Sequence, residues 1–236
     1  MTATTRRYAL IAAAGASVRF GGGLPKQYAP IGGVPLLAHT IAALNRSIVL
    51  EAIFVVLAPG DKHYAESIGS VAGVFPVYEG GVTRGESVRN GLAAVGKRAG
   101  AEDWVLVHDA VRPCIDVTTL NRLLHELEDE PVGGLLAVPL CDILKRAEVG
   151  AGLRAASTES RDGLWCAQAP QMFRYAILNH ALRRADVAQL LDEAQAVEAL
   201  GVKPRLVQGS PANIKITYPE DIAVAEAILA ARTRTV

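Results

Sequence analysis

A glycine-rich turn near the start of the chain carries two basic side chains, Arg19 and Lys26. The turn follows an apolar run, Ala9–Ala14, and a strand that ends in such a turn presents backbone N–H groups to a bound anion. It is neither the G-x-G-x-x-G of dinucleotide-binding folds nor a P-loop, which would need Gly-Lys-Ser/Thr. Two cations beside a triphosphate would stabilise the charge that builds up on a transferring phosphoryl group. A flexible turn without a ligand is the alternative interpretation.

A carboxylate stands at the end of another apolar run. Asp109, in His108-Asp109-Ala110-Val111-Arg112-Pro113, follows Trp104–Val107 directly. Ligands of parallel α/β sheets bind at the carboxyl ends of the strands, and Asp is a hard oxygen ligand suited to Mg²⁺. We therefore expect Asp109 to bind Mg²⁺, with a helix cap or a surface position as the alternative. His108 is expected to be structural, and the other histidines show no zinc-site spacing.

Two further segments offer polar groups to a nucleotide. In Gly80–Leu92 a glycine turn runs into a helical pattern whose first turn carries Arg84 and Ser87 on one face, near the positive end of the helix dipole. This suits the base and sugar of a nucleotide, and capping by Ser87 is the alternative. Lys215 lies in Asn213–Thr217, where the isoleucines favour a strand with Lys215 on the opposite face. That lysine is either functional or a protection against edge-strand pairing.

The residues favour phosphate chemistry without a covalent intermediate. The sequence has no Ser-His-Asp order and no reactive cysteine setting. A phosphate monoester is already ionised at pH 7, so the obstacle to its attack is repulsion between two polyanions. Mg²⁺ and several Lys or Arg side chains relieve that repulsion.

The elements that would position these residues alternate between strand and helix. Four apolar runs predict buried parallel strands: Ala9–Ala14, Ala52–Ala58, Trp104–Val107 and Gly134–Val138. Helical spacing follows in Val34–Leu44, Gly85–Arg98, Thr118–Leu127 (with Asp116 or Thr118 as its cap), Arg174–Ala185 and Glu193–Leu200. A strand at Pro204–Val207 and a last helix near Pro219 complete the chain. This rhythm predicts an α/β fold with a doubly wound, mostly parallel sheet.

The rhythm breaks between Leu140 and Met172, a polar and glycine-containing excursion. A long segment of this kind inside a compact domain is usually functional or interfacial. We expect residues 1–236 to form one domain that carries this excursion at about 140–172.

Composition excludes several classes of protein. The chain has 24 Lys and Arg against 24 Asp and Glu, so no global basic excess points to nucleic acid or to an anionic membrane. Its three cysteines are far apart and predict no disulfide framework. No apolar run approaches the roughly 18 residues of a membrane span. A cytoplasmic protein is expected.

Four motifs occur in order along the chain: Ala-Ala-Gly-x-x-x-Arg…Pro-Lys-Gln-Tyr, Gly-Gly-x-x-Arg-x-x-Ser-Val, Val-His-Asp-Ala-x-Arg-Pro and Asn-Ile-Lys-Ile-Thr-x-Pro-Glu-Asp. Together they closely resemble the 2-C-methyl-D-erythritol 4-phosphate cytidylyltransferase family of non-mevalonate isoprenoid biosynthesis. The similarity runs from about Ala9 to Ala231. It implies a Rossmann-like nucleotidyltransferase fold that converts CTP and methylerythritol phosphate, with Mg²⁺, to the CDP-linked alcohol and diphosphate.

The resemblance also implies residue roles. Arg19 and Lys26 would hold the CTP phosphates and stabilise the pentavalent phosphorus. Asp109 would bind Mg²⁺ and the methylerythritol hydroxyls with Arg112 beside it, and Lys215 would contact the attacking phosphate. The residues expected around the cytidine are Ala13, Ala14, Gly15, Gly81, Arg84 and Ser87.

The excursion at 140–172 resembles a β-arm through which members of the family form homodimers. Its Arg161 would then reach the substrate in the partner's site.

Several positions depart from the commonest pattern of the family. Ala169, Leu191 and Ile143 stand where threonine is frequent, and Ser17 replaces a common loop glycine. Because these hydroxyls are missing, a cytidylyltransferase that acts on another polyol phosphate, such as ribitol 5-phosphate, is an alternative interpretation. A catalytically silent nucleotide-binding protein is the rival from another class, and the intact cations and Asp109 argue against it.

Overall fold

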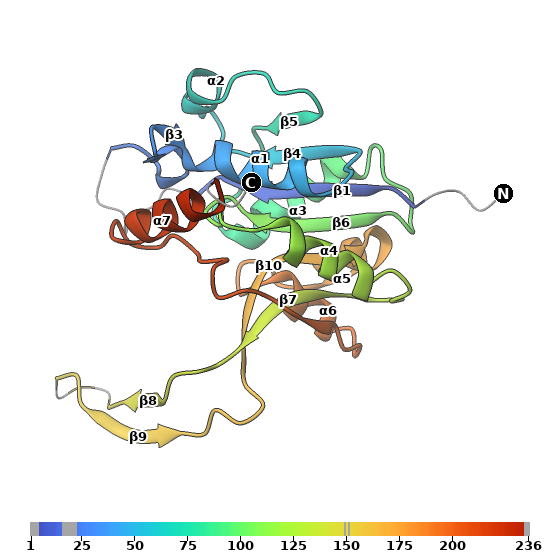
Figure 1. The fold of residues 1–236 in the computed structure, drawn as a ribbon. Coiled ribbons are helices and arrows are strands. Elements are labelled where there is room, and N and C mark those ends of the chain that lie inside the picture. Colours follow the sequence, from blue (N-terminus) through green and yellow to red (C-terminus); the bar gives the residue numbers. More distant parts are fainter. Residues whose placement is uncertain (1–4, 16–22, 149, 151, 234–236) are drawn as a thin grey trace.

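The structure, a computed structural model, is built on a central sheet with helices on both faces (Figure 1). It describes residues 5–15, 23–148, 150 and 152–233. Seven strands form the sheet in the order β11-β7-β10-β6-β1-β4-β5. Their bounds are β1 Arg7–Ala12, β4 Ala52–Val56, β5 Val74–Val77, β6 Trp104–Asp109, β7 Gly133–Pro139, β10 Trp165–Arg174 and β11 Arg205–Gln208.

Helices cover the two faces of this sheet in separate layers. Side chains of α1 and α4 pack on one face, and those of α3, α5 and α6 pack on the other. In β1, Ala9 and Ile11 join the first layer whereas Tyr8 and Leu10 join the second, as the alternation of a strand requires. The helices are α1 Leu36–Ser47, α2 His63–Ser67, α3 Arg84–Val95, α4 Val117–Glu126, α5 Tyr175–Arg184, α6 Glu193–Glu198 and α7 Asp221–Thr233, with a short 3₁₀ turn η2 at Lys26–Tyr28.

The predicted mostly parallel sheet is confirmed. All residues of β4 and β6 are buried, as expected for continuous apolar strands. Parallel pairing places Ala12 at the end of β1 beside Val56 of β4 and Asp109 of β6. The loops after these three strands therefore meet at one edge of the sheet. The predicted cap of α4 is also confirmed, because the Asp116 carboxylate accepts the Thr119 N–H.

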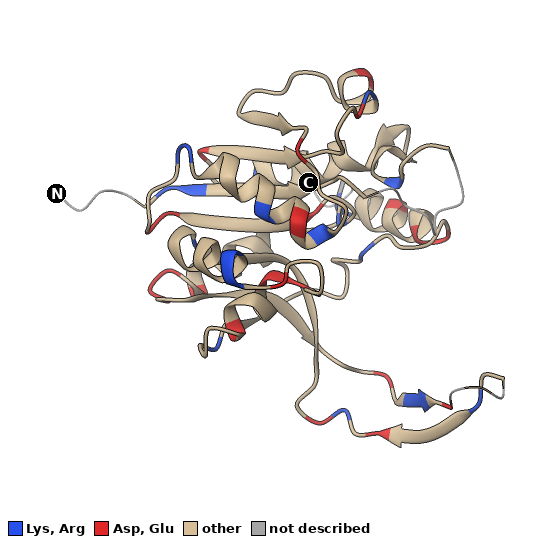
Figure 2. Ribbon diagram, turned by 180° about the vertical axis from the view of Figure 1, so that it is seen from behind, with Lys and Arg blue, Asp and Glu red and all other residues tan. Residues whose placement is uncertain are grey.

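The excursion predicted at 140–172 is shorter than expected, because its last part belongs to the main sheet. Strand β10 runs antiparallel between β6 and β7. Its buried Gln168 and Gln171 interrupt the apolar pattern and hide the strand in the sequence. The part that leaves the body is a two-stranded arm of β8 (Leu144–Ala147) and β9 (Ala155–Glu159). Figure 2 shows basic and acidic residues side by side along it.

The strand predicted at Asn213–Thr217 is wrong, although Ile216 is buried and the Lys215 side chain is 45 % exposed as alternation requires. The segment pairs with no strand of the described residues and is held by single hydrogen bonds. The Asn213 side chain donates to the Ala169 carbonyl at 2.8 Å, and the Ile216 N–H donates to the Val111 carbonyl at 2.9 Å. The elements that were not predicted include the short helix α2, the strand β5, which contains a proline, and a hairpin of β2 (Pro30–Ile31) and β3 (Val34–Pro35).

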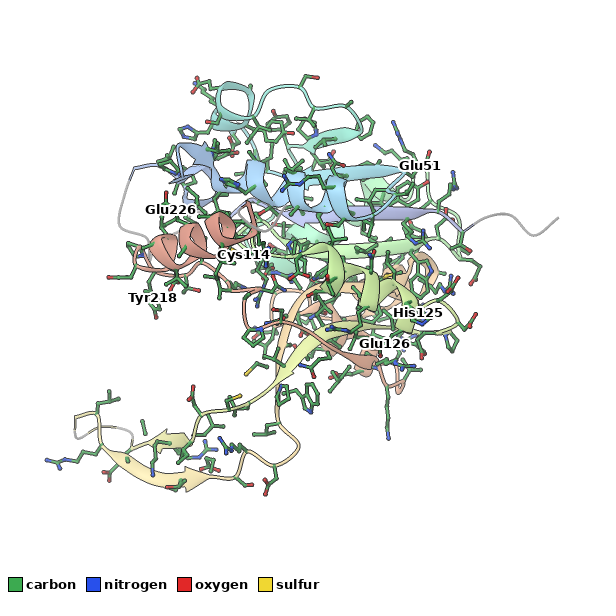
Figure 3. The ribbon with its side chains drawn as sticks, in the orientation of Figure 1. Glu51, Cys114, His125, Glu126, Tyr218 and Glu226 are labelled. Atoms are coloured by element: carbon green, nitrogen blue, oxygen red, sulfur yellow. The ribbon has the colours of Figure 1, made fainter. Side chains whose placement is uncertain are left out.

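The three cysteines are free thiols. Cys114 is buried beneath α7, where its Sγ lies 3.8 Å from the Ala225 carbonyl oxygen, and burial raises the pKa of the thiol to about 11 (Figure 3). Cys141 and Cys166 are exposed. Among the described helices, none combines the length and the apolar character that a membrane crossing demands.

Candidate active site

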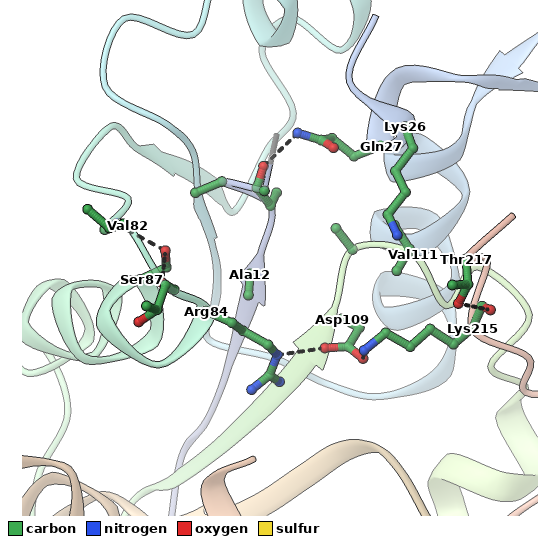
Figure 4. A pocket seen from close by; sticks show the side chains of 16 residues that line it. Ala12, Lys26, Gln27, Val82, Arg84, Ser87, Asp109, Val111, Lys215 and Thr217 are labelled. Atoms are coloured by element: carbon green, nitrogen blue, oxygen red, sulfur yellow. Dashed lines mark hydrogen bonds and ion pairs between the residues drawn. The ribbon is translucent and has the colours of Figure 1, made fainter. Parts of the chain in front are cut away.

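A cavity of about 570 Å³ opens at the carboxyl ends of β1 and β6 (Figure 4). Lys26 and Lys215 extend into it from one side, Arg84 and Ser87 come from the other, and Asp109 lies between Arg84 and Lys215. Most of the site residues predicted from the sequence line this one cavity: Ala13, Ala14, Gly15, Lys26, Gly81, Arg84, Ser87, Asp109 and Lys215. Arg19, the second cation of the opening turn, lies outside the described residues.

Asp109 is the centre of a cluster of charges. Its Oδ1 accepts a hydrogen bond from Nε of Arg84 at 3.0 Å, and its Oδ2 lies 3.0 Å from Nζ of Lys215 and 3.6 Å from Nε of Arg112. Burial alone would raise the pKa of Asp109. The charges of Arg84, Lys215 and Arg112 outweigh burial and hold the pKa below its ordinary value. Asp109 is therefore a permanent anion among cations at neutral pH.

A second carboxylate, Glu193, fixes Arg84 from behind the cavity. Its two oxygens accept hydrogen bonds from Nη1 and Nη2 of Arg84 at 2.6 and 3.1 Å, and its side chain is 2 % exposed. Burial would lower the pKa of Arg84, but Glu193 and Asp109 together raise it. The sequence did not reveal the role of Glu193. Its partner Arg84 is 109 residues away, and a glutamate at the first position of a helix is common.

Lys26 approaches the cavity from η2. Its Nζ donates to the Ile216 carbonyl oxygen at 3.1 Å, next to Lys215 in the chain. The adjacent Gln27, also missed as a site residue, donates through Nε2 to the Ala13 carbonyl at 2.8 Å and so ties η2 to the end of β1. The part of the chain at Lys26 and the Asn213–Thr217 segment thus meet at the cavity.

The opposite wall is the glycine turn before α3. Thr83, rather than Ser87, caps that helix through a capping box with Glu86. The Ser87 hydroxyl instead accepts the Gly81 N–H at 3.0 Å and donates to the Thr83 carbonyl at 2.9 Å, so it shapes the turn itself. A Cβ on Gly81 would lie 2.3 Å from the Glu86 Cβ, and glycine is therefore needed here.

Two predicted residues lie outside the cavity. Arg112 is 9 % exposed and donates through Nη1 to the Asn213 carbonyl at 2.6 Å, so in this structure it supports both Asp109 and the segment of Lys215. Arg161 lies between β9 and β10 on the arm and is not brought to the cavity of its own chain. His108 is fully buried beside the Arg112 carbonyl oxygen, and burial lowers its pKa to about 4, in keeping with the structural role predicted for it.

The described residues do not form a metal cage by themselves, since no group of three or more His, Cys, Asp and Glu among them could hold an ion. Asp109 is the carboxylate that faces the cavity. A carboxylate has about four acceptor positions, and three cations surround this one. Such a site suits Mg²⁺ that takes most of its ligands from substrate phosphates and water. Glycine backbone, cations and one carboxylate together suit a nucleoside triphosphate.

Known proteins resemble the chain over nearly its whole length. The profile of the 2-C-methyl-D-erythritol 4-phosphate cytidylyltransferase family matches residues 8–231. The enzyme of that name from Dechloromonas aromatica is 51 % identical over 229 residues, which cover 96 % of this chain and 99 % of the relative. A crystal structure of a 4-diphosphocytidyl-2C-methyl-D-erythritol synthase has a TM-score of 0.84 at 37 % identity and covers 95 % of this chain and 99 % of that chain. The Francisella tularensis cytidylyltransferase has a TM-score of 0.81 at 31 % identity, with 95 % and 100 % covered. The chain therefore belongs to the 2-C-methyl-D-erythritol 4-phosphate cytidylyltransferase family.

Proposed function

We propose that this chain, a nucleotidyltransferase of the non-mevalonate isoprenoid pathway, joins CTP to 2-C-methyl-D-erythritol 4-phosphate in the cavity described above. Family membership supports the reaction. The observation that supports the site is that Arg84 and Lys215 both pair with Asp109 at the strand ends, while Lys26 extends into the same cavity. We place the reaction in the cytoplasm, where free thiols stay reduced.

The reaction needs charge stabilisation rather than a general base. A phosphate oxygen of the alcohol substrate attacks the α-phosphorus of CTP and forms the new P–O bond. The bond from that phosphorus to the oxygen bridging to the β-phosphate breaks, and diphosphate leaves with the electron pair. Negative charge grows on the oxygens of the α-phosphate and on the leaving group, and Lys26, with Arg19, would stabilise it. The turns at Ala13–Gly15 and Gly81–Ser87 would hold the cytidine.

The second substrate would lie on the side of Lys215. The Lys215 ammonium is 3.0 Å from the buried Asp109 carboxylate, and the lysine side chain is 45 % exposed, so the incoming phosphate can reach it. Asp109 would accept hydrogen bonds from the polyol hydroxyls. Arg112 would hold Asp109 through an ion pair and the segment of Lys215 through the Asn213 carbonyl. The attacking phosphate would then meet CTP between Lys215 and Lys26.

Members of this family typically use a divalent metal. We propose Mg²⁺ bound by the CTP phosphates with one oxygen of Asp109. Such an ion would neutralise phosphate charge. The chain's own contribution is an Asp109 that stays ionised and is oriented by Arg84.

The arm gives a reason to expect a homodimer. A two-stranded ribbon is at best marginally stable alone in water, and Ile143 and Leu153 on this one are 68 % and 95 % exposed. A second copy could cover it, and dimers with two-fold symmetry are the commonest oligomers. We propose that the arms are exchanged and that Arg161 contacts the substrate phosphate in the partner's cavity.

One assay separates the rival substrates. Diphosphate release from CTP should be measured with 2-C-methyl-D-erythritol 4-phosphate and with ribitol 5-phosphate at equal concentrations. We expect kcat/KM to favour the methylerythritol phosphate strongly. Leu191, 84 % exposed, and the buried Ala169 bring no hydroxyl to the phosphate, so its affinity would rest on cations. Preference for ribitol 5-phosphate would overturn the proposed substrate, and no turnover with either would favour the silent nucleotide-binding protein.

A subunit-mixing experiment tests the exchanged arm. Arg161→Ala and Lys26→Ala homodimers should each be nearly inactive, because every site lacks one group. In the mixed dimer one site carries both defects and the other carries neither, so activity should return to about half of wild type. If demonstrated heterodimers stayed inactive, Arg161 would not act across the interface.

A further inference from the structure

The turn that carries Lys26 is held by the side chains of the two residues that follow it. This turn, η2, is three residues long, and Pro25 before it has no polar side chain to cap it. Both residues that follow Lys26 are buried, with Gln27 4 % and Tyr28 3 % exposed. Gln27 ties the turn to Ala13, and the Tyr28 hydroxyl donates to Oδ2 of Asp61 at 2.9 Å. The position of the Lys26 backbone therefore depends on an anchor in another loop.

That anchor is Asp61, whose carboxylate is itself held by several hydrogen bonds. Its other oxygen, Oδ1, accepts the N–H groups of His63 and Tyr64 at 2.9 and 3.1 Å and orders the start of α2. Its own N–H donates to the Ala58 carbonyl at 3.1 Å, which closes the turn after β4. These bonds hold the carboxylate within its own loop, independently of Tyr28. The hydrogen bond from Tyr28 to Asp61 therefore restrains η2.

The same loop also supports the opposite wall of the cavity. The Gly80 N–H donates to the Leu57 carbonyl at 2.8 Å, just before the glycine turn that leads into α3. A Cβ on Gly80 would lie 2.6 Å from that oxygen, so the wall sits directly against the end of β4. Residues 57–61 therefore connect the Lys26 side of the cavity with the Gly81 side.

The bond between Tyr28 and Asp61 has a fixed direction. Burial, with the hydrogen bond to Asp61, raises the pKa of Tyr28, so the phenol stays protonated and donates. A neutral donor to a carboxylate forms a stronger hydrogen bond than a neutral pair does. The ring is further restrained by His63, whose centroid lies 5.5 Å away.

We propose that Asp61 is a positioning residue for cytidylyl transfer, which acts through the Tyr28 hydroxyl to set where Lys26 meets the phosphates. The inference rests on the role proposed above for Lys26. A catalytic group must be held within about 0.5 Å of its productive position, and a displacement of about 1 Å can cost up to roughly 100-fold in rate. A three-residue turn without the Tyr28 anchor would lose that restraint.

The test compares variants that break the anchor with one that keeps it. Tyr28→Phe and Asp61→Ala should each lower kcat about tenfold and leave KM for the polyol phosphate unchanged. Asp61→Asn should keep near-normal turnover, because its amide N–H can donate to the phenol oxygen while its carbonyl still accepts at α2. Tyr64→Phe is the matched control: the Tyr64 hydroxyl is buried and has no hydrogen-bond partner among the described residues. That variant should turn over normally.

Double variants separate positioning from a general loss of stability. Tyr28→Phe combined with Asp61→Ala should lower kcat no more than Asp61→Ala alone, because both substitutions remove the same hydrogen bond between Tyr28 and Asp61. In a Lys26→Ala background, Asp61→Ala should have no further effect on the residual rate. Normal kcat in Tyr28→Phe and Asp61→Ala, or full additivity with Lys26→Ala, would overturn the positioning role. Normal kcat in Lys26→Ala itself would instead overturn the proposed role of that lysine.

Discussion

Glu193 should be among the residues on which the stability of this fold depends most. It is 1 % exposed, and both of its oxygens are bound by the Arg84 guanidinium. Glu193→Ala removes this partner and leaves Arg84 paired with Asp109 alone. The change therefore leaves a poorly compensated cation at the edge of the core.

The size of the loss follows from burial. Removing one member of a buried ion pair costs about 3–5 kcal/mol. The Arg84 side chain is 29 % exposed, so water relieves part of this cost, and we expect the lower end, about 3 kcal/mol. In a protein of this size 1 kcal/mol shifts Tm by about 2–4 °C, which predicts a fall of about 6–12 °C. Glu193→Gln keeps an acceptor for Arg84 and should lose about half as much.

Urea unfolding followed by circular dichroism at pH 7 measures this loss. Glu198→Ala is the matched control, because Glu198 lies on the same helix and is exposed. That variant should stay within about 0.5 kcal/mol of wild type. A Glu193→Ala variant no less stable than Glu198→Ala would refute the role given to the pair with Arg84.

Three other outcomes are expected. Lys26→Ala should lower kcat about 10²–10³-fold and change KM for CTP far less, measured by diphosphate release, because its contact tightens as charge develops. Asp109→Asn should abolish most Mg²⁺-dependent turnover while its circular dichroism stays native, because it keeps the shape and loses the charge. Asp103→Asn should remove the contribution of Asp103 to the pH dependence of the free energy of unfolding. Burial raises the pKa of Asp103, but hydrogen bonds from Gly100 and Arg6 outweigh burial and lower it. A lowered carboxyl pKa contributes stability in full above the unfolded value of about 3.9 and loses it as pH falls through the folded value. The stability difference between wild type and Asp103→Asn, from urea unfolding at pH 7 to 2, should therefore shrink below about pH 4.

Local patterns in the sequence predicted much of the fold. Strands β4 and β6 are buried on both faces, so continuous apolar runs identified them. Strand β10 was not predicted, because its buried glutamines are paired with residues distant in sequence. Gln168 Nε2 donates to the Ser210 carbonyl, and Gln171 forms hydrogen bonds with Asp192 and Ala194. No local pattern reveals that a buried polar side chain has such a partner.

The same limit applies to the candidate site. Asp109 could be located because it ends an apolar strand at the edge where α/β folds bind ligands. Glu193 and Asp61 could not, because their importance comes from Arg84 and Tyr28, to which only the folded chain brings them close. Sequence motifs identified residues that face the cavity, and missed the residues that hold those side chains from behind.

The false strand at Asn213–Thr217 bears on where the two lysines of this site lie, which is outside the strands and α-helices. A strand would hold Lys215 by a ladder of backbone bonds on both sides, whereas here single contacts hold the segment, through Asn213, Ile216 and Thr217. Lys26 likewise lies on a turn of three residues, whereas Asp109 ends strand β6. Loops held on a rigid scaffold are the usual place for binding residues. In this cavity the anion Asp109 ends a strand, and both lysines lie on short segments whose positions depend on a few contacts. Loss of one of those contacts would therefore be expected to slow turnover, because a catalytic group must be held close to its productive position.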